Sequence, residues 1–256
     1  MKLSLTVPKL LGAIATTTML TTIVPDVASA QVDFGTSSDG PGASLQEQLD
    51  DLIPRAEDKI DTVNDETGAE TFQTIGKGVT SFLLFEIAGF APFNTVGLYN
   101  SNGDMKELFS GSDAGVTQAR INKNELANDG FDEFGLYLTN KNGQTFYSET
   151  GRNAGGYDYF LAYQGSDENP IGLRGLTDNN LNDQGGRPRN NLNLRSNDFL
   201  FAFEDLPWGS SDKDYNDFVG VIRNVEVADV PEPTTMLGLA AVAGGALALR
   251  RRRQTV

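Results

Sequence analysis

The sequence predicts a mainly β protein, arranged as an antiparallel, jelly-roll-like β-sandwich with a short N-terminal helix and a C-terminal hydrophobic helix. Two observations lead to this class. From Thr71 onward the chain holds roughly nine or ten short apolar segments separated by turn residues, the pattern of an all-β domain. Helical spacing of apolar residues is clear only near residue 45. Each element is justified below in chain order.

The first 30 residues have the pattern of a secretory signal peptide. Two early lysines precede an apolar run over residues 10–24, which is too short for a membrane span of about 20 residues. Ala28 and Ala30 then form the small-x-small pattern that signal peptidase cleaves. We expect cleavage before Gln31. An uncleaved N-terminal anchor is the alternative, and it predicts the same exported location.

Residues 31–70 are interpreted as a linker that carries one short amphipathic helix. Ser44 followed by Glu47 forms a capping box, and Pro54 ends the helical pattern. The apolar residues at helical spacing are Leu45, Leu49, Leu52 and Ile53.

Residues 71–229 are predicted to form the β domain. Val79 to Ile87 is nearly continuously apolar, as expected for a strand buried on both faces. Asn102-Gly103 and Asn142-Gly143 each separate two strand-like segments, so each pair predicts a β-hairpin. The strands expected beside these turns are residues 95–99, 105–109, 134–139 and 145–148, and those expected elsewhere are 116–121, 157–163, 199–203 and 218–227.

The segment between Leu176 and Asn197 is rich in asparagine and contains Gly185-Gly186. We interpret it as an exposed loop, too polar to form a strand.

Composition excludes several classes of function. The formal net charge of −15 argues against nucleic-acid binding, which requires a basic surface. The absence of cysteine and histidine removes disulfides, thiolate nucleophiles, imidazole–zinc sites and histidine-assisted triads. Hydrolysis by two carboxylates remains open, as in glycosidases. We nevertheless expect a protein that is not an enzyme.

One acidic segment carries the pattern of a metal site. Six potential oxygen ligands fall within fourteen residues, the carboxylates among them repel one another, and a hard cation such as calcium relieves that repulsion. The segment is not an EF-hand, because its sixth position is Asp217 rather than glycine and its twelfth is Arg223 rather than glutamate. A solvated turn is the alternative. The candidate calcium ligands are Glu204, Asp205, Asp212, Asp214, Asn216 and Asp217.

The same segment also carries a family resemblance. Phe203-Glu204-Asp205, a short Gly/Ser spacer and residues 212–217 followed by an apolar strand resemble the domain of unknown function 4114 family. The resemblance implies a sandwich-like module of secreted bacterial proteins that binds metal through the acids of the motif. It implies no established activity.

Aromatic residues offer a competing site. Trp208 and Tyr215 are candidate carbohydrate contacts, because exposed aromatic rings stack on sugars. The alternative is that the tyrosines line one face of the sandwich and Trp208 caps its end.

The last 27 residues carry a second resemblance. Pro231-Glu232-Pro233 is followed by an apolar stretch over residues 234–249 and by four arginines, Arg250 to Arg253. These three elements resemble the PEP-CTERM sorting signal. The resemblance implies that an exosortase-type enzyme recognises the tail of residues 230–256, which holds the chain transiently in the inner membrane before it is cut.

Together these features predict an exported structural protein of the cell surface or extracellular matrix, stabilised by calcium and associated with exopolysaccharide. A carbohydrate-binding module is the first alternative, and a carboxylate-based glycosidase is the second.

Overall fold

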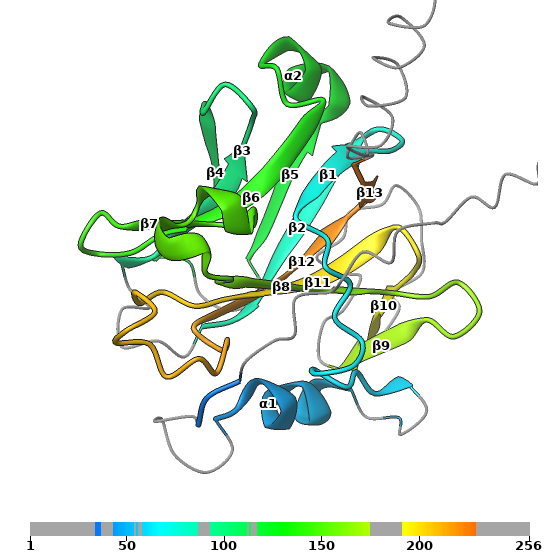
Figure 1. Cartoon of the computed structure of the whole chain (residues 1–256). Helices are drawn as coiled ribbons and strands as arrows, with labels where there is room; N and C mark the ends of the chain where they lie inside the picture. Colours follow the sequence, from blue (N-terminus) through cyan, green and yellow to red (C-terminus); the bar gives the residue numbers. More distant parts are fainter. Residues whose placement is uncertain are drawn as a thin grey trace, which may run out of the picture.

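The computed structural model describes residues 34–36, 43–53, 55, 58–86, 93–111, 113, 117–174 and 191–228. Within them the chain is mainly β, its strands pair antiparallel, and an N-terminal helix is present (Figure 1). These three predictions are confirmed. The signal peptide and the C-terminal tail lie outside the described residues, and so do their Ala28, Ala30 and Pro231–Pro233 motifs. None of the helices in the described part is long and apolar enough to cross a membrane.

The first large sheet has the strand order β13-β1-β6-β3-β4, and β7 pairs with β6. Its strands are β1 (Thr71–Thr74), β3 (Thr95–Tyr99), β4 (Met105–Ser110), β6 (Glu133–Thr139), β7 (Thr145–Tyr147) and β13 (Val225–Val227).

The second large sheet has the order β5-β2-β12-β11-β8, and a separate hairpin pairs β10 with β9. The strands of the second sheet are β2 (Gly78–Phe85), β5 (Gln118–Asn122), β8 (Phe160–Gln164), β11 (Asp198–Phe203) and β12 (Phe218–Arg223). The remaining elements are β9 (Ile171–Arg174), β10 (Asn191–Leu194), α1 (Leu45–Leu52), α2 (Lys123–Asn128) and the 3₁₀ turns η3 (Thr150–Arg152) and η4 (Ala154–Gly156).

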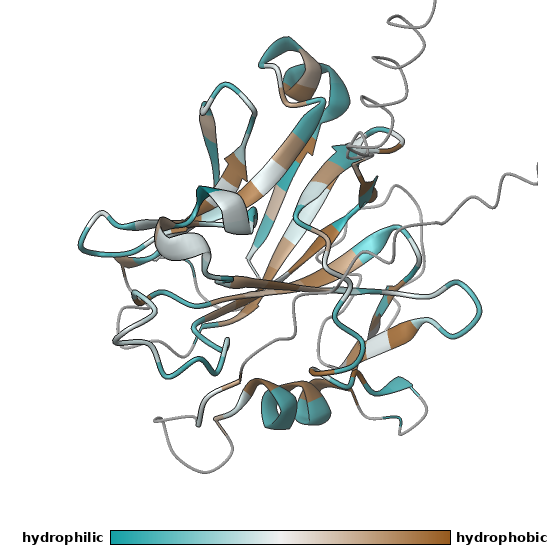
Figure 2. Cartoon of the chain, viewed as in Figure 1, coloured by the Kyte–Doolittle hydropathy of each residue, from teal (hydrophilic) through white to brown (hydrophobic). Residues whose placement is uncertain are grey.

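An aromatic core, here called the inner core, lies between the two large sheets. Phe72 of the first sheet packs edge-on against Phe199 of the second, with ring centroids 5.2 Å apart. Phe109 and Phe218 also meet across the sheets, as tilted rings with centroids 6.0 Å apart. Figure 2 shows that apolar residues concentrate in the strands and polar residues in the connections. Alternating residues of both sheets therefore bury one face in a common core.

The other face of the second sheet is also covered. Leu200 and Val221 on this face form an outer core with Leu49 of α1 and Leu192 of β10. Figure 1 shows α1 and the β9–β10 hairpin on this side of β8, β11 and β12. Burial on both faces explains why β11 is apolar at nearly every position. It also means that α1, which lies in the segment interpreted as a linker, packs directly on the sheet.

The predicted cap and spacing of the N-terminal helix are present. The Ser44 hydroxyl accepts a hydrogen bond from the Glu47 amide at 3.3 Å and donates to the Glu47 carboxylate at 3.1 Å. Leu45, Leu49 and Ile53 are at most 1% exposed. The amphipathic spacing therefore identified the face of α1 that is buried.

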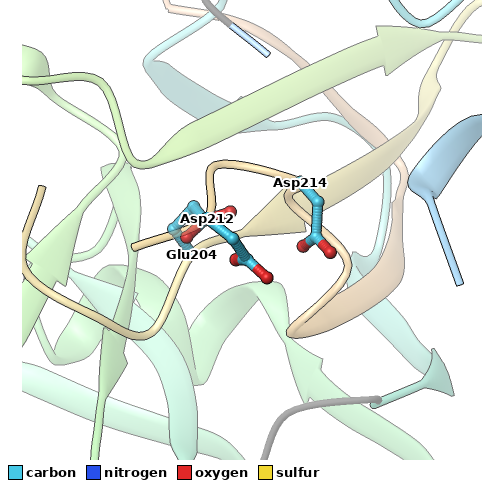
Figure 3. Close-up of side chains that lie close together, drawn as sticks. All are labelled: Glu204, Asp212 and Asp214. Atoms are coloured by element: carbon cyan, nitrogen blue, oxygen red, sulfur yellow. The ribbon is translucent and has the colours of Figure 1, made fainter. Parts of the chain in front are cut away.

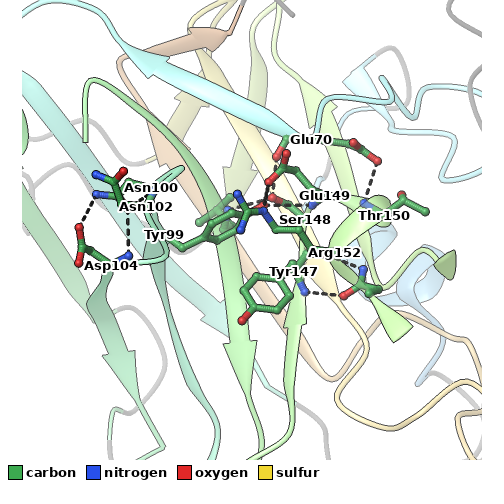
Figure 4. Close-up of polar contacts among 12 residues, drawn as sticks. Glu70, Tyr99, Asn100, Asn102, Asp104, Tyr147, Ser148, Glu149, Thr150 and Arg152 are labelled. Carbon is green, nitrogen blue, oxygen red and sulfur yellow. Dashed lines mark hydrogen bonds and ion pairs between the residues drawn. The ribbon is translucent and has the colours of Figure 1, made fainter. Parts of the chain in front are cut away.

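Both predicted Asn-Gly hairpins form, but their turn type differs from the expected tight turn. Gly103 has φ of 86°, whereas Asn102 is not among the residues with positive φ. The Gly103 amide donates to the Asn100 carbonyl at 3.0 Å, and the Asn100 side chain accepts from the Asn102 and Asp104 amides, each at 3.0 Å (Figure 4). This geometry is a wider turn closed by one left-handed glycine, stabilised by the side chain of Asn100.

The second hairpin repeats this arrangement and connects it to the acidic segment. The Asn140 side chain accepts from the Asn142 and Gln144 amides at 2.9 and 3.1 Å. Its amide nitrogen donates to the Asp205 carbonyl at 2.8 Å. The turn of the first sheet is thereby fixed to the end of β11 in the second.

The structure corrects three features of the strand assignment. β10 lies inside the segment predicted to be an exposed loop, because Leu192 and Leu194 alternate with polar residues and are at most 1% exposed. The predicted strand over 218–227 is two strands that belong to different sheets, since Asn224 adopts φ of 61° between them. The short helix α2 was missed, although Asn122 caps it by accepting from the Glu125 amide at 2.9 Å.

Candidate metal centre

The acidic loop between β11 and β12 has an unusual backbone. Lys213 and Tyr215 adopt φ of 58° and 56°, in the left-handed region that favours glycine. These two residues alternate with Asp212, Asp214 and Asn216. The loop is therefore curled rather than extended. Residues that are neither glycine nor asparagine persist in this conformation only where the surroundings hold them there.

Three carboxylates gather at this loop. Glu204 follows β11, and Asp212 and Asp214 lie in the loop after it (Figure 3). Each of the three offers an oxygen within 4.8 Å of the others. Within the part of the chain that the structure describes, these three acidic side chains are the ones close enough together to hold a metal ion. Glu204 and Asp214 are buried, whereas Asp212 is partly exposed.

Glu204 is held firmly at the centre of this group. One of its oxygens accepts a hydrogen bond from the Tyr215 amide at 2.7 Å, and the other accepts from the Ser211 hydroxyl. The pKa of Glu204 is raised to about 7, chiefly by burial and in part by the charges of Asp214 and Asp212, against the lowering effect of these bonds. Hydrogen-bond donors therefore fix the position of the Glu204 carboxylate, but they do not offset the cost of burying its negative charge.

Asn216 adds an oxygen without a partner. Its side chain is fully buried, and its amide nitrogen donates to Asp214 at 2.8 Å and to the Ala43 carbonyl. The other side-chain atom, Oδ1, is buried and accepts no hydrogen bond. Such an orphaned acceptor is rare in folded proteins and normally marks a place where a water or an ion binds. The Asn216 Oδ1 atom belongs to the same side-chain amide whose nitrogen donates to Asp214.

The remaining two predicted ligands form a different group. The Asp217 carboxylate accepts from the Asp205 amide at 2.8 Å, and the Asp205 carboxylate accepts from Asn94 at 2.9 Å. Glu204 and Asp205 are consecutive, so their side chains leave the end of β11 on opposite sides. The structure therefore brings four of the six predicted residues together, pairs Asp217 with the Asp205 amide and places the Asp205 side chain beside Asn94, which the sequence reasoning missed. Asn94 carried no local signal, because it lies 111 residues before Asp205.

The two candidate carbohydrate contacts differ in accessibility. Tyr215 is 1% exposed, and its hydroxyl donates to the Asp158 carbonyl at 2.8 Å, so its ring faces the interior. Trp208 is partly buried and stacks on Tyr157 with ring centroids 4.8 Å apart. The Lys213 ammonium lies 4.1 Å from the centre of the Trp208 ring. Trp208 is therefore in direct contact with the acidic loop.

Comparison with known proteins identifies the C-terminal tail. Residues 229–253 match the PEP-CTERM protein-sorting motif. This motif implies export, transient anchoring in the membrane and processing by an exosortase-type enzyme on the way to the cell surface. No curated protein and no solved structure matches the chain. The resemblance to the domain of unknown function 4114 family stays a prediction.

Proposed function

We propose that this chain is an exported, non-enzymatic structural protein of the cell surface or extracellular matrix, stabilised by calcium bound at Glu204, Asp212, Asp214 and Asn216. The observation that carries the calcium site is the convergence of three carboxylates beside the orphaned oxygen of Asn216. The sorting motif supports the location.

The chemistry of the donors favours calcium. Every candidate ligand is an oxygen, which suits hard cations, and the chain has no histidine or cysteine to attract softer metals. Calcium accepts six to eight oxygens in flexible geometry, so main-chain carbonyls of the curled loop and water can complete the shell. Extracellular calcium modules bind with dissociation constants of about 0.1–1 mM. An exported protein needs no tighter site.

The finer fold assignment is part of the same proposal. The shared inner core supports a β-sandwich of the jelly-roll-like kind. A module similar to the domain of unknown function 4114 family would have this architecture and would place the acids at one end of the second sheet. The C-terminal tail is proposed to cross the inner membrane as a helix until it is removed.

Binding to exopolysaccharide is the second candidate function. Tyr157 is 41% exposed and stacks on Trp208, and such a paired aromatic surface suits the apolar face of a sugar ring. The proposed calcium site would support this surface, because Lys213 connects Trp208 to the acidic loop.

The fluorescence of Trp208 reports directly on the proposed site, since it is the single tryptophan of the chain. Calcium bound at Asp212 and Asp214 would change the electrostatic field around Lys213, which lies between them in the sequence and contacts the Trp208 ring. We expect a saturable change in emission with a midpoint of about 0.1–1 mM calcium. Asp214→Asn should abolish the change.

Asp132→Asn is the matched control, because Asp132 is an exposed aspartate outside the acidic loop. It should titrate like the wild type. Emission that does not respond to calcium, or that responds equally in Asp214→Asn, would contradict the site.

A further inference from the structure

A pocket of about 490 Å³ lies at the end of the second sheet that is away from the acidic loop. Arg223 is the last residue of β12, whereas the acidic loop precedes the first, so about 17 Å of strand separates them. We call this hollow the basic pocket. The polar side chains that line it include those of Lys77, Thr80, Arg120, Arg223 and Asn224.

The strand register places two arginines of the basic pocket on one face of the sheet. Arg223 of β12 lies opposite Thr80 of β2, and Thr80 lies opposite Arg120 of β5. Directly opposite residues share a face, with Cβ atoms about 5 Å apart, so the arginines flank Thr80 and lie about 10 Å apart at Cβ. Val221, two residues before Arg223, packs in the outer core. The row therefore extends the outer face of the second sheet.

The charged side chains that line the basic pocket are cations. Lys77, Arg120 and Arg223 line it, and no aspartate or glutamate of the described residues does. The Arg223 Nε atom lies 3.1 Å from the buried carboxylate of Asp198, which holds the guanidinium in place and offsets part of its charge. The whole chain has a formal net charge of −15, so the pocket is opposite in sign to the protein around it.

The basic pocket has the chemistry of a site for a polar anion. Three cations attract negative charge, and the planar guanidinium of arginine binds carboxylates through paired hydrogen bonds. Thr80 and Asn224 add a hydroxyl and a side-chain amide, which suit the hydroxyls of a ligand. The apolar lining residues Val79 and Ile121 are 1% and 6% exposed and offer little apolar surface. A volume of about 490 Å³ suits a small organic molecule and exceeds the needs of a single inorganic ion.

The acidic charge of the rest of the chain does not prevent such binding. At an ionic strength of about 0.15 M, charges more than about 8 Å apart are largely screened in water. A short anionic ligand in the basic pocket therefore interacts mainly with the cations that line it. The acidic loop, about 17 Å of strand away, contributes little repulsion.

We propose that the basic pocket binds a sugar that carries a carboxylate, such as a uronic acid unit of an acidic polysaccharide. Lys77, Arg120 and Arg223 attract the carboxylate, and Thr80 and Asn224 bind hydroxyls of the sugar. The pocket shares no residue with the Glu204 group or with the Tyr157–Trp208 pair. The proposal therefore stands if either of those sites fails.

Isothermal titration with trigalacturonic acid tests the inference. Residues 31–230 contain every helix and strand that the structure describes, and calcium is stripped from them so that it cannot bridge carboxylates. At an ionic strength of about 0.15 M the wild type should bind the trisaccharide, and a neutral galactose trisaccharide should not bind. Lys77→Gln and Arg120→Gln should each weaken binding by about five- to tenfold, as expected for the loss of one charged contact.

Lys141→Gln is the matched control, because Lys141 is an exposed lysine in the turn between β6 and β7 and does not line the basic pocket. It removes the same charge and should bind like the wild type. An equal loss in Lys141→Gln and in the pocket variants would show general attraction between charges and would overturn the site. No binding of the trisaccharide, or equally tight binding of inorganic phosphate, would overturn the sugar assignment.

Two further comparisons separate the basic pocket from misfolding and from the other proposed sites. Lys77 and Arg120 are exposed, so their variants should keep the thermal unfolding midpoint of the wild type. Trp208→Ala and Asp214→Asn should bind trigalacturonic acid as the wild type does. Binding that is lost in Trp208→Ala but unchanged in Lys77→Gln and Arg120→Gln would place the sugar on the aromatic pair and would overturn the inference.

Discussion

Replacing Leu49 with alanine should lower the free energy of unfolding by about 2–5 kcal/mol, the usual range for a fully buried leucine. Leu49 lies on α1, is 0% exposed and packs in the outer core against the second sheet. The substitution leaves a cavity between the helix and strands that are themselves buried on both faces. Urea unfolding of residues 31–230 measures the loss.

Leu52→Ala is the matched control on the same helix. Leu52 is only partly buried at the edge of the outer core, so its replacement should cost clearly less. If both substitutions changed stability by no more than about 0.5 kcal/mol, as surface changes do, α1 would be a linker helix and not part of the core.

Replacing Asp158 with asparagine should stabilise the protein at pH 8. The pKa of the Asp158 carboxyl is raised from 3.8 to about 7, mainly by burial and in part by the charges of Glu66 and Glu70. The folded state therefore favours the protonated form. Folding loses stability as pH rises from about 4 to about 7, and the full loss of about 2–4 kcal/mol persists above that range.

The asparagine keeps the acceptor for the Phe160 amide, which Asp158 binds at 3.0 Å. The Tyr163 hydroxyl also faces this position, and because burial raises its pKa it stays neutral throughout the range, while the Tyr215 hydroxyl donates to the Asp158 main-chain carbonyl. Thermal unfolding should show a gain at pH 8 that shrinks toward zero near pH 4. A gain independent of pH would show that the carboxyl of Asp158 is ionised normally in the folded state.

Local patterns in the sequence predicted much of the fold. The capping box at Ser44 and the glycines of the two Asn-Gly turns act through near neighbours, so they were readable without the structure. β10 was missed because Leu192 and Leu194 are two apolar residues in a polar stretch, and they become a strand only by pairing with β9 and packing on the second sheet. The packing of α1 was missed for the same reason, because the outer core that it joins includes residues as distant along the chain as Leu192 and Leu200.

The candidate site was predictable to the same extent. The acids of the β11–β12 loop are close in sequence, so their gathering around Glu204 could be expected. The separation of the Asp205 side chain from that of Glu204 could not be expected. It depends on which side of the strand end each side chain leaves, and on the contacts of Asp205 with Asn94 and Asn140 of the other sheet.

Thermal unfolding of residues 31–230 in chelator and then in calcium tests the central claim most directly. At a hundredfold excess over the dissociation constant, calcium at the Glu204 site should contribute about 2.7 kcal/mol. For a domain of this size the midpoint should rise by about 5–10 °C, and magnesium should raise it less. A midpoint that stays constant up to about 100 mM calcium, a hundredfold excess over a dissociation constant of about 1 mM, would contradict a calcium-stabilised protein and would direct attention to the paired rings of Tyr157 and Trp208.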